Sequence, residues 1–186
     1  MKSQSIYAQL ATLFEYPGEN YVSRAKQCAE RVSREQQGSA ALEEFCAAID
    51  GKSSDELQEL FTQTFDLNPV CTLEIGWHLY GEDYQRGEFL VKMRQQLRTH
   101  EVKESQELPD HLTHALQLLA SMEDEEAAAF AGQFLLPALD KMRSGWRDNR
   151  NAFAALLDST FALLKSHYHF EPVQPLRTVP ALRVLR

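Results

Sequence analysis

Residues 65–87 read FDLNPVCTLEIGWHLYGEDYQRG and interrupt an otherwise helical chain with a short irregular run. Pro69 lacks an amide hydrogen and disfavours helical geometry at Asn68, so we expect a turn there and a short helix over residues 72–79. The run also combines Trp, His and Tyr side chains with an acidic pair between glycines and an Arg-Gly pair. A helix that only fills a core does not need these residue types, so this run is the first candidate for a functional site.

The chain on both sides of this run has the apolar spacing of amphipathic helices. Ser53 and Glu56 form a capping-box pattern, and Leu57, Phe61 and Phe65 follow at intervals of four residues. In the second half, a long helical pattern contains a proline at position 137, which should kink or split it. The expected helices span residues 5–14, 21–34, 40–50, 72–79, 82–98, 108–120, 122–146 and 151–168, together with one that begins after Ser53.

No segment has the alternating pattern of a β-strand, apart from a short stretch between prolines near residues 177–185. The sequence therefore predicts an all-α, single-domain helical bundle of about eight or nine helices over residues 1–170. Residues 99–107 are polar and are expected to form a mobile linker between its halves. Residues 171–186 hold three prolines, so we expect an extended arm over the surface or a disordered end.

Composition limits the class of protein. A chain of 186 residues with 44% hydrophobic and 25% charged residues is long enough for one sizeable core. The net charge of −8 argues against binding to nucleic acid or to an anionic membrane, and it favours a neutral or basic partner.

The sequence also indicates a compartment. Three widely spaced cysteines give no disulfide framework or zinc knuckle, which suggests a reducing environment. The N-terminal residues lack a secretory signal, and no run approaches the roughly 18 apolar residues of a membrane span. We therefore expect a soluble, cytoplasmic protein without stable membrane insertion.

Signatures of catalysis are missing from the sequence. It contains no Gly-x-Ser-x-Gly elbow, no Gly-x-Gly-x-x-Gly loop and no Walker-type Gly-Lys-Thr/Ser, and its eight glycines are scattered. Cys71 lies near a helix start, where the helix dipole could lower its pKa, but an inert, partly buried thiol is the simpler interpretation. We expect that the protein is not an enzyme.

A metal site is the alternative function. Glu74 and His78 lie four residues apart, and His111 and His114 lie three apart, so each pair could share a helix face and bind a metal. A small helical metalloprotein or metal-dependent enzyme would use these four residues. The competing interpretation is that they are surface or hydrogen-bonded histidines, since the paired Glu-x-x-His motifs of a di-iron bundle are absent.

The same region has the residues that peptide binding requires. An apolar groove with aromatic anchors holds a peptide, and carboxylates at its rim select basic side chains. Trp77, Tyr80 and Tyr84 have the spacing of such anchors if their helix is nearly continuous. Each could equally be a core residue, and each carboxylate could simply be solvated. The candidate rim carboxylates are Asp66, Glu74, Glu82 and Asp83.

Several short motifs, in the same order and spacing, resemble the nitrate reductase delta subunit family of molybdenum-cofactor assembly chaperones, which belongs with the TorD-like redox enzyme maturation proteins. They are Thr64-Phe65-Asp66-Leu67-Asn68-Pro69, His78-Leu79-Tyr80-Gly81, Arg86-Gly87 and Glu107-Leu108-Pro109-Asp110. Near the N-terminus, Leu13-Phe14-Glu15-Tyr16-Pro17 is similar to the family's Leu-x-x-Tyr-Pro signature. The resemblance covers roughly residues 5–165.

This resemblance implies a cytoplasmic, non-catalytic chaperone without a cofactor of its own. It would bind the N-terminal or twin-arginine-like peptide of the apo catalytic subunit of a molybdoenzyme while the client's molybdenum cofactor is inserted, before export or membrane docking. The chain is shorter at its C-terminus than nitrate reductase members, so the client is expected to be a nitrate reductase-like reductase or a dehydrogenase. It would act as a monomer or a domain-swapped dimer; a permanent subunit of a complex is a further possibility.

The resemblance and the residue pattern together define a candidate peptide site. For Arg86, the alternative is a structural ion pair with Asp66 or Asp110. For Gly87, the alternative is close helix packing, which would offset the cost of a mid-helix glycine. The candidate site residues are Phe65, Asp66, Leu67, Glu74, Trp77, His78, Tyr80, Gly81, Asp83, Tyr84, Arg86, Gly87, Leu108, Pro109, Asp110 and His111.

Overall fold

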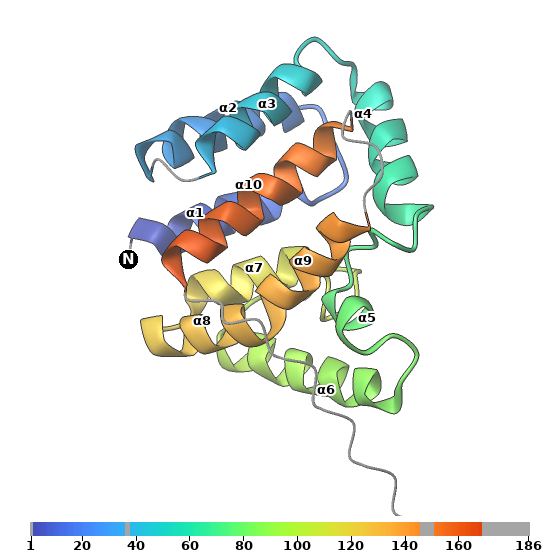
Figure 1. The fold of residues 1–186 in the computed structure, drawn as a ribbon, viewed down its shortest axis with the longest axis vertical. Helices are drawn as coiled ribbons and strands as arrows, with labels where there is room; N and C mark the ends of the chain where they lie inside the picture. Colours follow the sequence, from blue (N-terminus) through green and yellow to red (C-terminus); the bar gives the residue numbers. More distant parts are fainter. Residues whose placement is uncertain (1, 36–37, 146–150, 169–186) are drawn as a thin grey trace, which may run out of the picture.

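The computed structural model describes residues 2–35, 38–145 and 151–168, and the regular structure within these ranges is helical (Figure 1). An isolated antiparallel bridge between Glu74 and His111 is present, and no strand occurs in the described ranges. The all-α prediction is therefore confirmed. The helices are α1 (Lys2–Leu13), α2 (Tyr21–Val32), α3 (Ser39–Ile49), α4 (Ser54–Phe61), α5 (Ile75–Tyr80), α6 (Tyr84–Thr99), α7 (Leu112–Ser121), α8 (Asp124–Phe130), α9 (Leu136–Ser144) and α10 (Ala152–His167), with a 3₁₀ turn η1 (Ser33–Glu35) and two π-helical turns, η2 (Thr62–Asp66) and η3 (Ala131–Leu135).

The helices form two groups (Figure 1). The N-terminal group consists of α1, α2 and α3, and α10 packs on α3. Helix α1 also packs on α7 of the second group, so that α1 and α10 connect the two groups. Helix α5 packs against both α6 and α9 in the second group. No described helix is both long enough and apolar enough to cross a bilayer.

An aromatic cluster joins α4 and η2 to the rest of the core. The rings of Phe61 and Phe65 each lie within 5.5 Å, centroid to centroid, of Phe153 in α10. Phe14 at the end of α1 packs edge-on against Phe65 at 6.3 Å. Such ring pairs contribute about 0.5–1.5 kcal/mol beyond the burial of their area, so the cluster fixes the end of η2 in place.

The start of α4 follows the expected capping box. The Ser53 amide donates to Glu56 Oε2 at 2.8 Å, and the Glu56 amide donates to Ser53 Oγ at 3.3 Å. The apolar positions Leu57, Phe61 and Phe65 are all buried, as their spacing predicted. The helix cap and the packing of the apolar side chains therefore both stabilise α4.

The long helix expected over residues 122–146 is divided by a π-helical turn. Turn η3 leads into α9, which has Pro137 in its first turn. A proline is tolerated there because the missing amide hydrogen would have no partner within α9 itself. The expected split near Pro137 is confirmed.

Two expected helix starts are wrong for one shared reason. Helix α5 begins at Ile75 rather than at residue 72, and α7 begins at Leu112 rather than at residue 108. The residues before both helices pair with each other: the Ile75 amide donates to the Asp110 carbonyl at 3.0 Å, and the Leu112 amide donates to the Leu73 carbonyl at 2.8 Å. The N–H and C=O groups that pair across this bridge are not available for helical hydrogen bonds, so both helices begin after it.

Residues 99–107 connect α6 to the bridge and make several contacts with their surroundings. The Val102 amide donates to the Leu97 carbonyl at 2.8 Å, and Glu104 forms an ion pair with Arg94 at 2.9 Å. The mobility of this segment stays a prediction, as does the single-domain organisation over residues 1–170. The expected arm at residues 171–186 lies outside the described residues.

Candidate functional site

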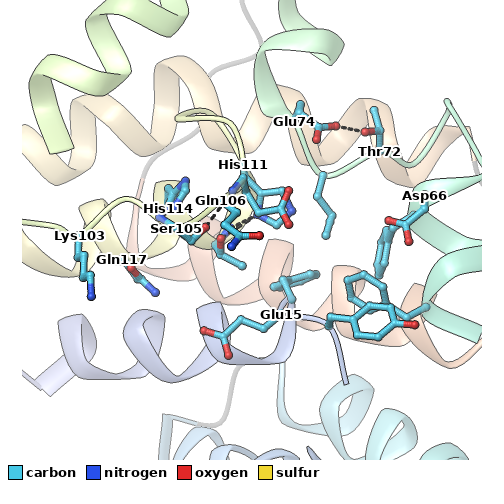
Figure 2. Close-up of a pocket in the computed structure, with 17 residues that line it drawn as sticks. Glu15, Asp66, Thr72, Glu74, Lys103, Ser105, Gln106, His111, His114 and Gln117 are labelled. Atoms are coloured by element: carbon cyan, nitrogen blue, oxygen red, sulfur yellow. Dashed lines mark hydrogen bonds between the residues drawn. The ribbon is translucent and has the colours of Figure 1, made fainter. Parts of the chain in front are cut away.

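A cavity of about 660 Å³, which we call the main groove, opens where five segments of the chain meet (Figure 2). The end of α1, the α4–η2 helix, residues 72–74, residues 103–107 and the first turns of α7 each provide one part of its wall. The lining residues are Phe14, Glu15, Tyr16, Phe61, Phe65, Asp66, Thr72, Leu73, Glu74, Lys103, Ser105, Gln106, Glu107, His111, Thr113, His114 and Gln117.

The bridge between Glu74 and His111 forms one wall of the main groove, and Asp110 anchors it. Asp110 is fully buried, and its Oδ2 atom accepts a hydrogen bond from the Gly76 amide at 2.9 Å. Burial raises the pKa of Asp110, and the hydrogen bond from Gly76 opposes that rise. A Cβ atom on Gly76 would lie 2.5 Å from Asp110 Oδ2, so only glycine allows this close approach.

His114 ties residues 103–108 to α7. The Ser105 amide donates to His114 Nε2 at 2.9 Å, so that nitrogen is an acceptor and the ring proton lies on Nδ1. The Nδ1 proton is then donated to the Leu108 carbonyl at 2.9 Å. Both ring nitrogens are occupied, and His114 holds the loop that closes one side of the groove.

His111 is the N-cap of α7, with its Nδ1 accepting from the Thr113 amide at 3.3 Å. Burial lowers the pKa of His111 to about 4, with a further contribution from His114. A depressed histidine pKa means that the unfolded chain binds the proton first, so stability falls as pH drops from about 6.5 toward 4. The ring is therefore neutral at physiological pH and serves as a hydrogen-bond acceptor.

We expect that replacing His111 with asparagine will flatten this pH dependence. Asparagine keeps an N-cap acceptor but cannot titrate, so the wild-type protein should lose about 1–2 kcal/mol more unfolding free energy than His111→Asn between pH 7 and pH 5. Urea denaturation at the two pH values measures the difference. Glu74 and Asp110, whose raised pKa values act with the opposite sign, are present in both proteins and cancel. Equal losses in the two proteins would contradict the assignment.

The main groove combines an aromatic wall with an acidic rim. Phe14, Tyr16, Phe61 and Phe65 provide the aromatic surface, and Tyr16 remains 55% exposed. Four carboxylates line the same space, whereas Lys103 is the only lysine or arginine among the described residues that line it. The four carboxylates are those of Glu15, Asp66, Glu74 and Glu107.

The rim carboxylates differ in their partners. Glu15 forms an ion pair with Arg24 at 2.8 Å, and Glu74 accepts a hydrogen bond from the Thr72 hydroxyl (Figure 2). Burial raises the pKa of Glu74, and the nearby Asp110 adds to the rise. Asp66 is exposed and forms no ion pair with any described residue, so it remains available to a basic ligand.

A smaller pocket of about 270 Å³ adjoins the main groove and shares Asp66, Thr72 and Glu74 with it. Its other wall contains Trp77, whose ring lies 5.3 Å from the guanidinium carbon of Arg86. The two cavities thus meet at Asp66 and the 72–74 segment, and Arg86 adds a basic side chain to the smaller one.

The structure brings only part of the predicted site together. Phe65, Asp66, Glu74 and His111 line the main groove, and Trp77 and Arg86 line the smaller pocket. The remaining predicted residues, Leu67, His78, Tyr80, Gly81, Asp83, Tyr84, Gly87, Leu108, Pro109 and Asp110, line neither cavity.

The expected row of three aromatic anchors is wrong. Helix α5 ends at Tyr80, and Gly81 has a φ of 60°, so Tyr84 belongs to a separate helix and is 82% exposed. The ring of Tyr80 packs against Phe89 at 5.4 Å instead of facing the groove. Only Trp77 of the three borders a cavity on this side.

The two structural alternatives for the Arg-Gly pair have different outcomes. Arg86 forms no direct ion pair with Asp66 or Asp110 in the described part of the chain, but its charge acts to lower the pKa of Asp110. Its guanidinium lies over Trp77. A Cβ atom on Gly87 would meet nothing within 4 Å, so this glycine does not permit close packing. No structural reason for a glycine at this position is evident.

The four residues of the alternative metal site do not converge. Within the described ranges, no group of three His, Cys, Asp or Glu side chains could hold a metal ion. His78 uses Nε2 to contact the Thr72 carbonyl at 2.7 Å, and burial lowers its pKa. Cys71 is buried, and burial raises the pKa of its thiol to about 11, which agrees with an inert cysteine.

The predicted site omitted the wall that residues 14–16 provide directly after α1. Phe14, Glu15 and Tyr16 belong to the Leu13–Pro17 motif, which resembled the family signature but was not assigned to the site. That motif was the available signal. The groove residues Lys103, Ser105, Gln106 and Gln117 had no comparable signal in the sequence.

Comparisons with known proteins identify the family of this chain. A family model described as nitrate reductase delta subunit matches residues 33–159. Two curated relatives, the nitrate reductase molybdenum cofactor assembly chaperones NarJ of Escherichia coli K12 and of Escherichia coli O157:H7, are each 28% identical over 104 residues. The match covers 55% of this chain and 44% of each relative, so the aligned part is less than half of the relatives' length. Because the family model spans more than half of the chain, the protein belongs to the nitrate reductase delta subunit family.

Proposed function

We propose that this protein is a cytoplasmic chaperone for the apo catalytic subunit of a molybdoenzyme. It binds the N-terminal peptide of that subunit, assists insertion of the client's molybdenum cofactor, and delays export or membrane docking until insertion is complete. The names of the two relatives support the class of client, since both are nitrate reductase molybdenum cofactor assembly chaperones. The protein performs no reaction and carries no cofactor of its own.

The observation that carries the proposal is the main groove with its aromatic wall and acidic rim. An N-terminal leader that alternates apolar and basic residues is complementary to both surfaces. Its apolar side chains pack on Phe65 and Tyr16, and its basic side chains approach Asp66 and Glu74. The carboxylates act mainly on specificity and association rate, whereas burial of apolar area supplies most of the affinity.

The smaller pocket extends this binding surface toward Trp77 and Arg86. A second client residue fits between the Trp77 ring and the carboxylates of Asp66 and Glu74. Among the other predicted site residues, Asp110 holds the bridge, and Leu108 and Leu67 are exposed apolar groups. The free chaperone is a monomer or a dimer exchanged through residues 99–107.

Calorimetric titration tests the proposal directly. The purified protein is titrated with synthetic N-terminal peptides of the molybdoenzyme catalytic subunits encoded in the same genome, with scrambled peptides as controls. We expect saturable one-to-one binding to one peptide, weakened at least tenfold when its basic residues are replaced by glutamine. A folded protein that binds none of these peptides would exclude the proposed function.

A further inference from the structure

A second groove, of about 300 Å³, lies between α6 and the helix formed by α8 and η3, and we call it the α6–α8 groove. It shares no residue with the main groove. Its surface is mostly apolar, from Phe89 and Met93 of α6 and from Phe130 and Phe134 of the facing helix. Aromatic and thioether side chains of this kind form adaptable surfaces for extended peptides.

The α6–α8 groove also contains a polar group without a partner. Gln96 lines the groove, and its Oε1 atom is buried and accepts no hydrogen bond from any described residue. A buried amide oxygen left in this state carries a free-energy cost. A peptide N–H donor in the groove would remove that cost, which points to a polypeptide ligand rather than a purely apolar one.

The sequence of residues 169–186 has a period that suits such a groove. Apolar side chains recur at every third position over the whole segment, and prolines occupy three other positions. A period of three is that of the polyproline II helix, which prolines favour and whose backbone groups stay free to bind a partner. The apolar edge would consist of Phe170, Val173, Leu176, Val179, Leu182 and Leu185.

The charges of the two elements are complementary. The segment has three arginines, which are separated by multiples of three residues and therefore lie on one edge, next to the apolar edge. Its single acidic residue is Glu171. The facing helix begins with four exposed carboxylates, Glu123 to Glu126. Glu126 itself lines the groove and contacts His100 Nε2 at 3.1 Å, and Lys92 is the one basic side chain among the described lining residues.

The point at which the described chain ends places the segment close to the groove. Tyr168 packs against Tyr7 at 6.0 Å, and the end of α10 lies beside α7 and α8 (Figure 1). Burial raises the pKa of Tyr168, and the carboxylate of Asp124 in the first turn of α8 adds to the rise. Eighteen further residues span up to about 60 Å when extended, so the segment is long enough to reach the whole groove.

We propose that residues 169–186 dock into the α6–α8 groove of their own chain in a polyproline II conformation. The apolar edge faces Phe89, Met93 and Phe130, and a backbone N–H group meets Gln96. The arginines face the carboxylates at the start of α8. This docking closes an apolar surface that is separate from the main groove.

Limited proteolysis of the full chain tests the proposal. Trypsin cleavage after Arg183 is followed by mass spectrometry in the wild-type protein and in two variants of exposed α8 alanines. Ala129 lines the groove, so Ala129→Trp fills it, whereas Ala128→Trp adds the same ring outside the groove. We expect Ala129→Trp to speed cleavage at least tenfold and Ala128→Trp to leave the rate unchanged. Equal rates in all three folded proteins would overturn the proposal.

A second pair of variants tests the period within the segment. Leu176→Asp places a charge on the apolar edge, and Thr178→Asp places it on the third edge, which carries neither those six apolar side chains nor the arginines. We expect only Leu176→Asp to speed cleavage after Arg183, and equal effects would contradict the three-residue repeat. Protection that disappears on dilution would assign the groove to the segment of a second copy and overturn docking within one chain.

Discussion

Replacing Gly76 with alanine is expected to lower the unfolding free energy by about 2–4 kcal/mol, a large effect for one added methyl group. The new Cβ atom would lie 2.5 Å from Asp110 Oδ2 and 2.9 Å from a ring carbon of Phe89. The Asp110 carboxylate would have to move away from the Gly76 amide, leaving a fully buried acid without its hydrogen-bond donor. Urea denaturation followed by circular dichroism measures the loss.

Gly87→Ala is the matched control for this change. Gly87 lies within α6, and a Cβ atom there would meet nothing within 4 Å. Alanine should therefore stabilise the protein by about 0.5–1 kcal/mol through its higher helix propensity. If both substitutions changed stability by the same amount, Gly76 would have no special role in holding the Glu74–His111 bridge.

Replacing Asp66 with lysine is expected to weaken binding of the client peptide more than tenfold. Asp66 lines both cavities and forms no ion pair with another described residue, so reversing its charge repels basic ligands from the whole surface. Titration calorimetry at low salt and at 0.5 M salt measures the effect, which screening should reduce at high salt.

Glu82→Lys makes the same change in net charge outside both cavities. Glu82 is exposed and lies in the turn between α5 and α6. At about 0.1 M salt its effect on peptide affinity should be less than twofold, because Glu82 lines neither cavity and salt screens exposed charges that make no direct contact with the ligand. Comparable losses for Asp66→Lys and Glu82→Lys would show that net charge, and not the groove, determines affinity.

The sequence predicted the helices well because their signals are local. The capping box at Ser53, the apolar stripe of α4 and the split near Pro137 depend on residues within a few positions of one another, and all three are confirmed. The late starts of α5 and α7 occur where backbone groups pair across a long stretch of chain, whereas α1 begins three residues earlier than expected. Such pairing has no local pattern in the sequence.

The candidate site was predicted only in part for the same reason. Residues 65–77 include several groove residues, and the irregular composition of this run indicated them correctly. The opposite wall comes from residues 14–16, directly after α1, and from residues 103–107, which reach the groove only through folding. Tyr84 was misassigned because the chain breaks at Gly81 and Tyr84 begins a separate helix, α6.

The two π-helical turns give the helices an extra residue beside each groove. Turn η2 ends at Asp66 of the main groove, and turn η3 contains Gln133 and Phe134 of the α6–α8 groove. One additional residue rotates everything after it by about 100° relative to an uninterrupted α-helix. The number of residues in each turn, rather than their identity, therefore sets the direction in which the groove-lining side chains point. Single-residue insertions and deletions in these turns offer a route by which relatives could change client without changing their core.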